Sequence, residues 1–355
     1  MRRIALEQLQ PGMYLSRPLI APDGKVLLHE GIAMKERYIQ YLRHQGITYL
    51  YVDEPQTQDI IVEDVVAPNL RLEAMKKAQQ VVKNFQVGKG VELEGVKAAI
   101  STMITQLSSK PENMMHFMDI RHKEDYMFAH AVNTCILAVM TGISLGYNDV
   151  QLEELGLAAM VHDVGKIRFP KKLALKNPGV LKEEEKEEYR QHPFYSMEIL
   201  KESGLPMNVI KACFEHHERW NGSGYPMGLE GDTISEYAQI ISISDVYDRL
   251  TAGTPHRRPT PPYYAAAIIN KAAGEYFNPA IVEKFNENIA VYPIGTMVQL
   301  NNHQIGVIVD VSKENKTTPV VRIIFGEEQA KLNELIELDL RKHPELFIVE
   351  FEDLQ

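Results

Sequence analysis

The chain has 355 residues, of which 45% are hydrophobic and 24% are charged, so it can bury a large core and form two or three domains. Its formal net charge of −10 argues against binding a nucleic-acid polymer, because that function normally needs a broad basic face. The longest nearly apolar stretch, Cys135 to Leu145, is shorter than the roughly 20 residues of a membrane span, and the N-terminus lacks a signal-peptide pattern. We therefore expect a globular, cytoplasmic protein without a membrane span.

Residues 1–62 predict a small N-terminal α/β domain. A strand is clearest at Ile47 to Val52, which is rich in β-branched and aromatic residues. One helix is expected around Met34 to Gln45.

Residues 63–110 are interpreted as a helical connector. Helix-forming residues dominate Asn69 to Asn84 and Val91 to Gln106. A packed part of the following domain is an equal alternative. A helical segment between two domains also makes a homodimer a candidate assembly.

Residues 111–288 are expected to be all-α. One helix is predicted from apolar residues at steps of three and four, which form a single buried stripe with His130 and Thr134 on a neighbouring face: Phe128, Val132, Cys135, Val139 and Ile143. A second helix is expected from Gln151 to His162, with Gly165 as its C-terminal cap. A third covers Asn278 to Phe285, with asparagine as the cap and proline at the first helical position.

Residues 289–355 predict a small β-rich C-terminal extension. Apolar and polar residues alternate with period two in GTMVQL, QIGVIVDV and PVVRIIF, and β-branched residues are frequent there. The expected fold class is therefore mainly α, with a helical central domain between two smaller units.

Histidine and aspartate residues concentrate in the helical region. Neighbouring residues on a helix point about 100° apart, so His162 with Asp163, and His216 with His217, can reach two adjacent metal ions more easily than one. A lone histidine on an apolar helix face is more often a core residue, but this many candidates together favour a multinuclear site. Nitrogen and oxygen donors without a nearby thiolate suit iron, manganese, zinc or nickel.

Five short motifs follow one another in this region. They are HDVGK from His162, QHP from Gln191, HHE from His216, GSGYP from Gly222 and SDVYDRLT from Ser244. Their order resembles the HD-GYP family, bacterial phosphodiesterases that hydrolyse cyclic di-GMP and belong to the HD superfamily of metal-dependent phosphohydrolases. The resemblance covers roughly residues 111–288 and implies an HD-GYP domain there.

The resemblance implies a set of metal ligands, with Asp163 as the bridge between two ions: His130, His162, Asp163, His192, His216, His217 and Asp245. Lys166 matches the family's active-site lysine. Members with a third metal carry a glutamate four residues before the position of His130, whereas this chain has Tyr126. We therefore expect two divalent transition-metal ions, iron or manganese first, with zinc or nickel as alternatives.

Such a centre suits the cleavage of a phosphodiester. Two cations about 3.5 to 4 Å apart can lower the pKa of a shared water, hold the phosphate and stabilise in-line attack. Lys166 can offset charge on the phosphoryl oxygens, and the alternative is an ordinary solvated lysine. Asp163 and Lys166 are thus the candidate catalytic residues.

The glycine-rich motif is a candidate substrate loop. Gly222 and Gly224 allow close approach of the backbone to a ligand, and Pro226 limits the freedom of the loop. Tyr225 can stack on a guanine or donate a hydrogen bond. Trp220, the only tryptophan, either lines the edge of the expected substrate site or holds the loop in place. Without the neighbouring histidines, the motif would be read as a simple turn.

Three charged residues are assigned supporting roles. Asp248 shares a helix face with Asp245 and fits a carboxylate that orients a ligand histidine; a surface salt bridge is the alternative. Arg257 and Arg258 are the candidates for clamping the substrate phosphates, although a solvated loop patch is an equal reading.

The chain departs from the family at positions other than the metal ligands. The family text after the last ligand usually reads DALTSDRPYR, whereas this chain has DRLTAGTPHRRPTPP. Thr254 and His256 thus replace an arginine and a tyrosine expected near the substrate. Asn221 replaces an aspartate and Ala131 a serine. These differences spare the predicted metal ligands, so we expect metal binding to be kept. They affect positions expected near the substrate, so we expect the affinity or the base preference to differ from that of the family.

The leading functional hypothesis is a phosphodiesterase that opens cyclic di-GMP to linear pGpG, and onward to GMP, in bacterial second-messenger signalling. One alternative is a cyclic dinucleotide receptor with low turnover, which the replacement at Thr254 favours. Another is a phosphodiesterase that prefers cyclic GMP-AMP, because the motifs do not distinguish guanine from adenine.

Overall fold

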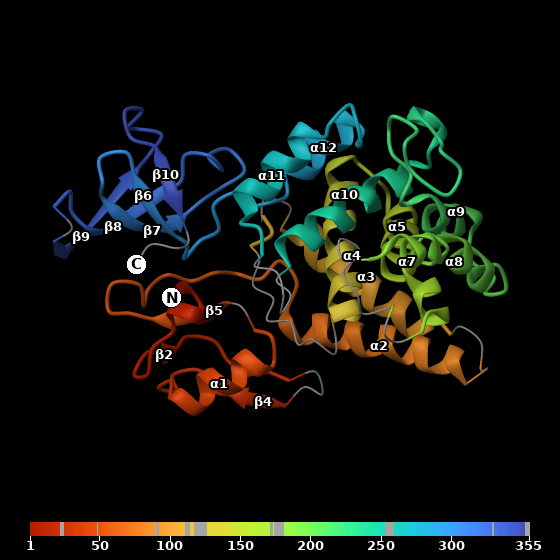
Figure 1. Ribbon diagram of the computed structural model, residues 1–355. Coiled ribbons are helices and arrows are strands. Elements are labelled where there is room, and N and C mark those ends of the chain that lie inside the picture. Colours follow the sequence, from red (N-terminus) through yellow and green to blue (C-terminus); the bar gives the residue numbers. More distant parts are fainter. Residues whose placement is uncertain are drawn as a thin grey trace.

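The computed structural model describes residues 1–351 except 22–24, 48, 88, 90–91, 111–113, 117–125, 171–172, 174–180, 253–258 and 329. A helical domain lies between an N-terminal unit and a C-terminal sheet in the sequence, and the two terminal units lie side by side in space (Figure 1). The expectation of a mainly α protein with two smaller units containing strands is confirmed.

The N-terminal unit is built around a small antiparallel sheet. Its strand order is β1-β5-β2, with β1 at Arg2–Ala5, β2 at Tyr14–Leu15 and β5 at Tyr49–Asp53. Strands β3 (Leu19–Ile20) and β4 (Val26–Leu28) form a second pair. Helix α1 (Glu36–His44) packs Ile39 and Leu42 into the same core as Leu50. The predicted strand and helix are both present.

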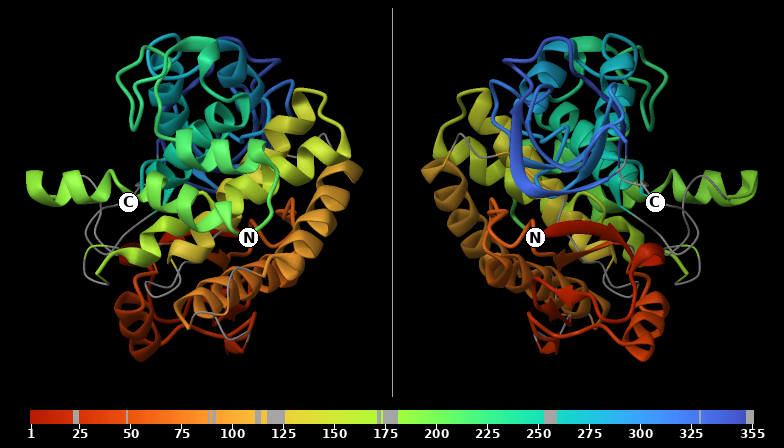
Figure 2. Two further views of the ribbon diagram at one scale, coloured as in Figure 1. Left: turned by 90° about the vertical axis from the view of Figure 1, so that its right-hand side faces the viewer. Right: turned by 90° about the vertical axis from the view of Figure 1, so that its left-hand side faces the viewer.

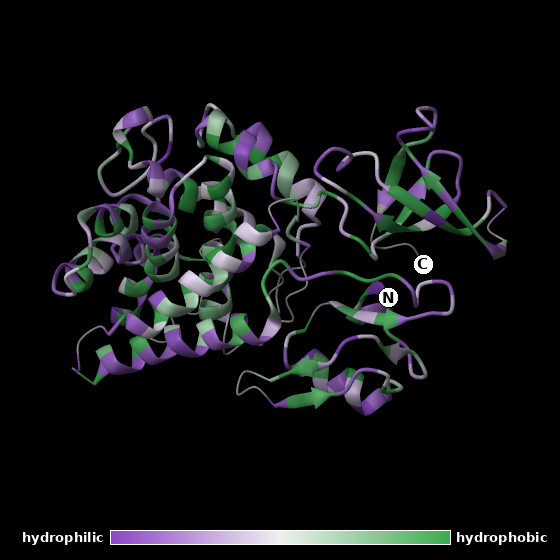
Figure 3. Ribbon diagram, turned by 180° about the vertical axis from the view of Figure 1, so that it is seen from behind, coloured by the Kyte–Doolittle hydropathy of each residue, from purple (hydrophilic) through white to green (hydrophobic). Residues whose placement is uncertain are grey.

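Four helices of the central domain share one hydrophobic core: α2 (Pro68–Gln86), α3 (Glu94–Ser109), α4 (Tyr126–Ser144) and α5 (Asp149–Val161). Figure 3 shows hydrophobic and hydrophilic residues alternating along α2, as expected for a helix with one face on a core. Helices α2 and α3 therefore pack against the central domain, while the boundaries proposed between domains stay a prediction.

Helix α4 runs through the middle of this core. The prediction of a single buried stripe was too narrow, because every residue from Ala129 to Gly142 is buried. Among the described helices, α4 is long and apolar enough to cross a membrane, yet 78% of its apolar window is buried inside the domain. A helix that is apolar all round is expected at such a central position.

The expected cap at Gly165 is wrong. Helix α5 ends at Val161, and a short 3-10 helix, η2 (Val164–Arg168), runs through Gly165. A Cβ at Gly165 would collide with the carbonyl oxygen of His192, and its N–H donates to Ser196 Oγ at 2.9 Å. Glycine is therefore needed for the close approach of α8 (His192–Lys201).

The remaining helices complete the domain: α7 (Glu183–Tyr189), α9 (Met207–Glu215), α10 (Glu236–Thr251), α11 (Pro262–Lys271) and α12 (Pro279–Asn286), with a 3-10 turn, η4, at Gly231–Thr233. Asn278 caps α12 as predicted, since its side chain accepts from the backbone N–H of Ala280 at 3.0 Å. Helix α10 packs against α4, α9 and α12, so it crosses the core at the level of the histidine cluster.

The C-terminal unit is an antiparallel sheet with strand order β10-β6-β7-β8-β9. Its strands are β6 (Met297–Leu300), β7 (Ile305–Asp310), β8 (Val320–Phe325), β9 (Lys331–Asp339) and β10 (Ile348–Phe351). The first three correspond to the predicted segments. The two views in Figure 2 confirm that this sheet lies against the N-terminal unit, where the N–H of Arg3 donates to Gly295 O at 2.9 Å.

Candidate metal centre

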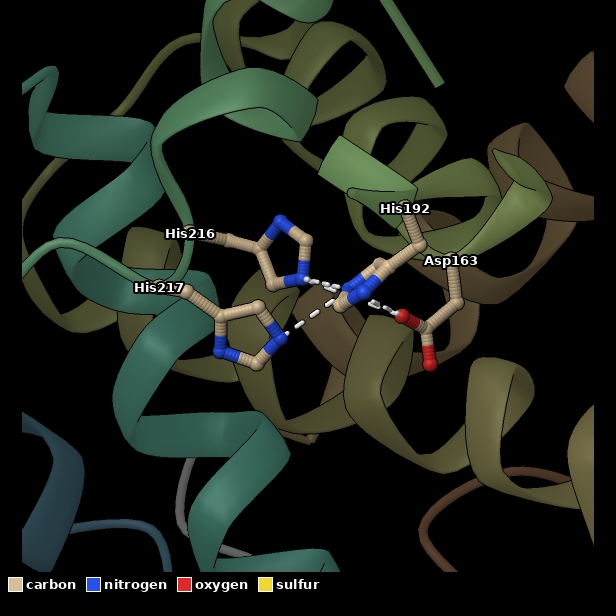
Figure 4. Close-up of side chains that lie close together, drawn as sticks. All are labelled: Asp163, His192, His216 and His217. Atoms are coloured by element: carbon tan, nitrogen blue, oxygen red, sulfur yellow. Dashed lines mark hydrogen bonds and ion pairs between the residues drawn. The ribbon is translucent and has the colours of Figure 1, made fainter. Parts of the chain in front are cut away.

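Five of the seven predicted ligands come from the ends of helices or just beyond them, and they converge with His130 of α4 and Asp245 of α10 in the middle of the domain. They form two sets of four whose ligand atoms lie within 4.8 Å of one another: Asp163, His192, His216 and His217, and His130, His162, Asp163 and Asp245. Figure 4 shows the first set, with three imidazoles and one carboxylate directed toward one another. Asp163 belongs to both sets, which is the position required of a bridging carboxylate.

Three histidines are held by their own local backbone. In each, Nδ1 bonds the carbonyl oxygen three residues earlier: His162 to Ala159 at 2.7 Å, His192 to Tyr189 at 2.7 Å and His216 to Cys213 at 2.8 Å. Because a carbonyl only accepts, each Nδ1 must carry the hydrogen. In the neutral form of each ring, Nε2 then has a lone pair directed into the cluster, the tautomer that metal-binding histidines use.

His130 is oriented by a side chain instead of the backbone. Its Nδ1 lies 2.6 Å from Asp248 Oδ2, and the other oxygen of Asp248 accepts from Asn133 Nδ2 at 3.0 Å. Asp248 is completely buried, so it is not the surface salt bridge of the alternative reading. The other ring nitrogen of His130 lies 2.8 Å from Asp245 Oδ1.

The inward-facing atoms fit a cation. Within the described residues, Nε2 of His130, Nε2 of His162 and Oδ1 of Asp163 are buried and form no well-aligned hydrogen bond. Their near neighbours are other members of the cluster, such as Asp245 Oδ1 at 2.8 Å from His130 Nε2 and His192 Nε2 at 3.1 Å from Asp163 Oδ1. His192 Nε2 lies 3.4 Å from His216 Nε2 and 3.0 Å from His217 Nε2. For His192 and His216, whose hydrogens are on Nδ1, this places two lone pairs face to face. A bound metal would satisfy these atoms.

Burial keeps three of the histidines, His192, His216 and His217, neutral. It lowers the pKa of His192 to about 3, although Asp163 partly opposes it, and it lowers the pKa of His216 and His217 as well. Burial also disfavours the charged form of His162, but Asp163 and Asp245 outweigh it and raise the pKa to about 9. Metal binding must therefore release the proton of His162.

Two cationic side chains balance the carboxylates. Burial tends to raise the pKa of Asp163 and of Asp245, but Lys166 beside Asp163 and Arg249 beside Asp245 help to hold both pKa values well below the usual range. Lys166 is buried and forms an ion pair with Asp163 Oδ2. This placement excludes the reading of Lys166 as an ordinary solvated lysine.

Arg249 is a residue that the sequence reasoning missed. Its Nε bonds Asp245 Oδ1 at 2.6 Å, and its Nη2 bonds Asp163 Oδ2 at 3.1 Å. A signal was present in the sequence, because the family text DALT reads DRLT in this chain. The guanidinium thus joins the carboxylate shared by the two ligand sets, Asp163, to the second carboxylate of the His130 set, Asp245.

The glycine-rich loop closes over one side of the cluster. Gly222 has a φ of 77°, and a Cβ at Gly224 would collide with the backbone of Glu218 and Arg219. The ring of Tyr225 stacks on His217 with centroids 4.7 Å apart. Tyr225 therefore contacts a candidate ligand, a role not foreseen when it was expected to stack on a guanine.

Glu218 is a second residue that was missed. Its carboxylate accepts from the backbone N–H groups of Met227 at 2.7 Å and Leu229 at 3.0 Å, which fastens the loop beyond Pro226. The backbone N–H of Trp220 donates to Tyr276 O at 3.1 Å, which joins the loop to the domain. The role of the Trp220 side chain stays a prediction.

Four predicted or discussed positions cannot be placed. Arg257 and Arg258, the expected phosphate clamps, lie outside the described residues, as do Thr254 and His256. Their roles stay predictions. The other predicted residues of the metal set, with Lys166 and Asp248, are brought together in one buried cluster.

The fold and the cluster define a class of protein, the α-helical proteins that gather histidine and aspartate side chains into adjoining metal-ligand sets. Residues 114–281 match the family model of the HD domain, and residues 297–355 match a KOW domain associated with the HD domain. Residues 114–281 therefore form an HD domain, and the resemblance to the HD-GYP family that the motifs indicated is confirmed.

Several known proteins are similar to this chain. A cyclic di-GMP phosphodiesterase, PA4108 of Pseudomonas aeruginosa, is 27% identical over 69% of this chain and 59% of its own length. A cyclic di-GMP phosphodiesterase of Thermotoga maritima is 36% identical over 40% of this chain and 39% of its own. The chain therefore spans less than two thirds of the length of these relatives.

The fold also has a solved counterpart. Bd1817, an HDG"Y"P protein from Bdellovibrio bacteriovorus, has a TM-score of 0.51 at 17% identity, covering 80% of this chain and 98% of its own. At this identity, the likeness concerns the fold alone.

Proposed function

We propose that the protein is a metal-dependent phosphodiesterase that hydrolyses cyclic di-GMP, with linear pGpG or GMP as alternative end products. The observation that carries the proposal is the pair of four-residue ligand sets joined at Asp163. The names of the similar proteins from Pseudomonas aeruginosa and Thermotoga maritima support the same reaction.

The donor sets suit two divalent transition-metal ions, iron or manganese first and zinc or nickel as alternatives. Imidazole nitrogen and carboxylate oxygen dominate both sets, and the two cysteines are buried outside them. When bound, such ions supply an activated water and neutralise charge on the phosphate.

The chain's own residues prepare the site for this chemistry. Backbone carbonyls and Asp248 fix the imidazoles before any ligand arrives, so little reorganisation is needed on binding. Lys166 brings a buried positive charge to the bridging carboxylate, where it can stabilise negative charge that develops on phosphoryl oxygens. The loop that carries Tyr225 limits access to one side of the cluster.

A second candidate substrate is cyclic GMP-AMP. A 3'3'-cGAMP-specific phosphodiesterase of Vibrio cholerae is 31% identical over 42% of this chain and 32% of its own length. The metal cluster would serve both substrates, because it acts on the phosphodiester and not on the base. A third candidate function is that of a receptor, which would bind the cyclic dinucleotide at the same cluster but hydrolyse it slowly.

The test is a chromatographic assay of both cyclic dinucleotides with iron-loaded and manganese-loaded protein. We expect cleavage of cyclic di-GMP together with about two metal ions per chain by elemental analysis. Asp163→Ala should lose both the activity and the metal, since Asp163 belongs to both sets. Asp149→Ala removes an exposed carboxylate at the start of α5, the helix that precedes Asp163; it is the matched control and should retain both. An Asp163→Ala variant that cleaves normally would refute the proposal.

A further inference from the structure

The charges in the cluster are balanced by the protein itself. Asp163 and Asp245 supply two negative charges, and Lys166 and Arg249 supply two positive charges in direct contact with them. Each carboxylate would be a ligand of the proposed centre, yet each already has a cationic partner from the chain. Divalent ions therefore have to compete with this internal pairing.

Arg249 is placed differently from Lys166. Lys166 is buried and contacts Asp163 alone of the two carboxylates, whereas the guanidinium of Arg249 joins Asp245 Oδ1 at 2.6 Å to Asp163 Oδ2 at 3.1 Å. These two carboxylates belong to the same four-residue ligand set, with ligand atoms within 4.8 Å of one another. The planar fork of arginine can span two such oxygens, which the point charge of lysine does less well.

Arg249 also has a route out of the cluster. Its side chain is 22% exposed, compared with 8% for Asp163 and 2% for Asp245. It is therefore the most solvent-exposed of the three, and its long, flexible stem allows the guanidinium to withdraw toward water. Withdrawal would also break the bond from its Nη1 to the Tyr189 hydroxyl at 3.3 Å. An ion bound to the same oxygens would repel the guanidinium in that direction.

We propose that Arg249 takes the place of a metal ion in the metal-free protein. Its guanidinium bridges Asp163 and Asp245 and releases their oxygens when an ion binds. This inference rests on the proposed metal centre, and it adds a residue that lowers the affinity of that centre for metal ions. After release, the guanidinium lies at the open side of the site, where an anionic phosphodiester has to enter. Arg249 is thus a positioning residue for the carboxylates before metal binding.

The experiment is a titration of metal-free wild-type protein and Arg249→Ala with Mn²⁺ by calorimetry. We expect Arg249→Ala to bind Mn²⁺ at least about tenfold more tightly, because the ion no longer has to break two charge-assisted hydrogen bonds. The metal-free variant should also melt at a lower temperature than metal-free wild type, because two nearby carboxylates lose their shared cation. Added Mn²⁺ should then raise its melting temperature by more than it raises that of wild type.

Two further variants keep the test decisive. Arg249→Lys retains the charge without the fork and should have an intermediate affinity. Arg168→Ala removes an arginine paired with Glu198 on the surface and should bind Mn²⁺ as wild type does. Equal or weaker binding by folded Arg249→Ala would overturn the inference while leaving the metal centre in place. If neither wild type nor any variant bound Mn²⁺, the metal centre itself would be refuted, and the inference with it.

Discussion

At the scale of single residues, the site depends on fixing one ring nitrogen of four of its five histidines so that the other nitrogen is available. His162, His192 and His216 use a backbone carbonyl for this purpose, so their tautomer follows from helix geometry. His130 uses Asp248, a side chain from α10. A substitution can therefore change the tautomer of His130 without disturbing a helix.

Asp248→Asn should weaken one of the two metal sites selectively. The amide nitrogen of asparagine would face either His130 Nδ1 or Asn133 Nδ2, both of which donate to Asp248 now. We expect the set that contains His130 to lose affinity by about 10- to 100-fold, as is typical when the partner of a ligand histidine is changed. Elemental analysis after dialysis should give about one ion per chain instead of two.

The complementary variant is His217→Ala, which removes a ligand of the other set. It should also retain about one ion, and the double variant should retain none. Two ions bound with unchanged affinity by Asp248→Asn would show that Asp248 does not orient a ligand.

At the scale of elements, the segment between α9 and α10 links the metal cluster to the candidate substrate loop. His216 and His217 follow the last residue of α9, and Glu218 comes directly after them. The carboxylate of Glu218 accepts from two backbone N–H groups on the far side of the loop. The loop is thus fastened to the same turn that carries two candidate ligands. Its position should matter for substrate binding more than for metal binding.

Glu218→Gln should raise KM for cyclic di-GMP with little change in metal content. The substitution turns one acceptor into a donor that faces a backbone N–H, so one of two hydrogen bonds to a charged group is lost. Such bonds contribute about 1.5–3 kcal/mol each, and we expect KM to rise on the order of tenfold. Steady-state kinetics with elemental analysis measures both quantities. Glu202→Gln, an exposed glutamate after α8, is the control, and a parallel loss of metal would contradict a role confined to the loop.

The elements also show what could be predicted from the sequence. The helices and the C-terminal strands followed from periodicity, which is a local pattern, and the candidate ligands followed from the resemblance of the motifs to a known family. Gly165 was misplaced because the reason for a glycine there is the carbonyl of His192, which is distant in the sequence. Glu218 was missed because its partners lie on the far side of the loop, and the bridging position of Arg249 was missed because Asp163 lies on another segment.

At the scale of the whole molecule, the two ends of the chain form a joint body beside the helical domain (Figure 1). The segment that leaves the N-terminal unit packs Ile60 against Met297, Val307 and Ile324 of the C-terminal sheet. A movement of either terminal unit would therefore be transmitted to the other, and through α2 to the core that holds α4.

Arg322 is the main polar link in this joint body. Its guanidinium makes a bidentate pair with Asp59 at 2.6 and 2.7 Å and also bonds Glu337 at 2.6 Å and the carbonyl of Gln56 at 2.9 Å. The side chain is 6% exposed, whereas Asp59 is 62% exposed. Solvent therefore screens part of the attraction, but the guanidinium itself would be costly to leave without partners.

Arg322→Ala should loosen the N-terminal unit from the C-terminal sheet. Because Asp59 is exposed, we expect the free energy of unfolding to fall by only about 1–2 kcal/mol, while segment 54–66 becomes easier to cleave. Limited proteolysis followed by mass spectrometry would locate the cleavage, and chemical denaturation would measure the stability. Arg341→Ala, whose partner Asp339 is two residues away on the same segment, should change neither result. Equal cleavage rates at segment 54–66 in wild type and Arg322→Ala would mean that the apolar contacts of Ile60 alone hold the two units together.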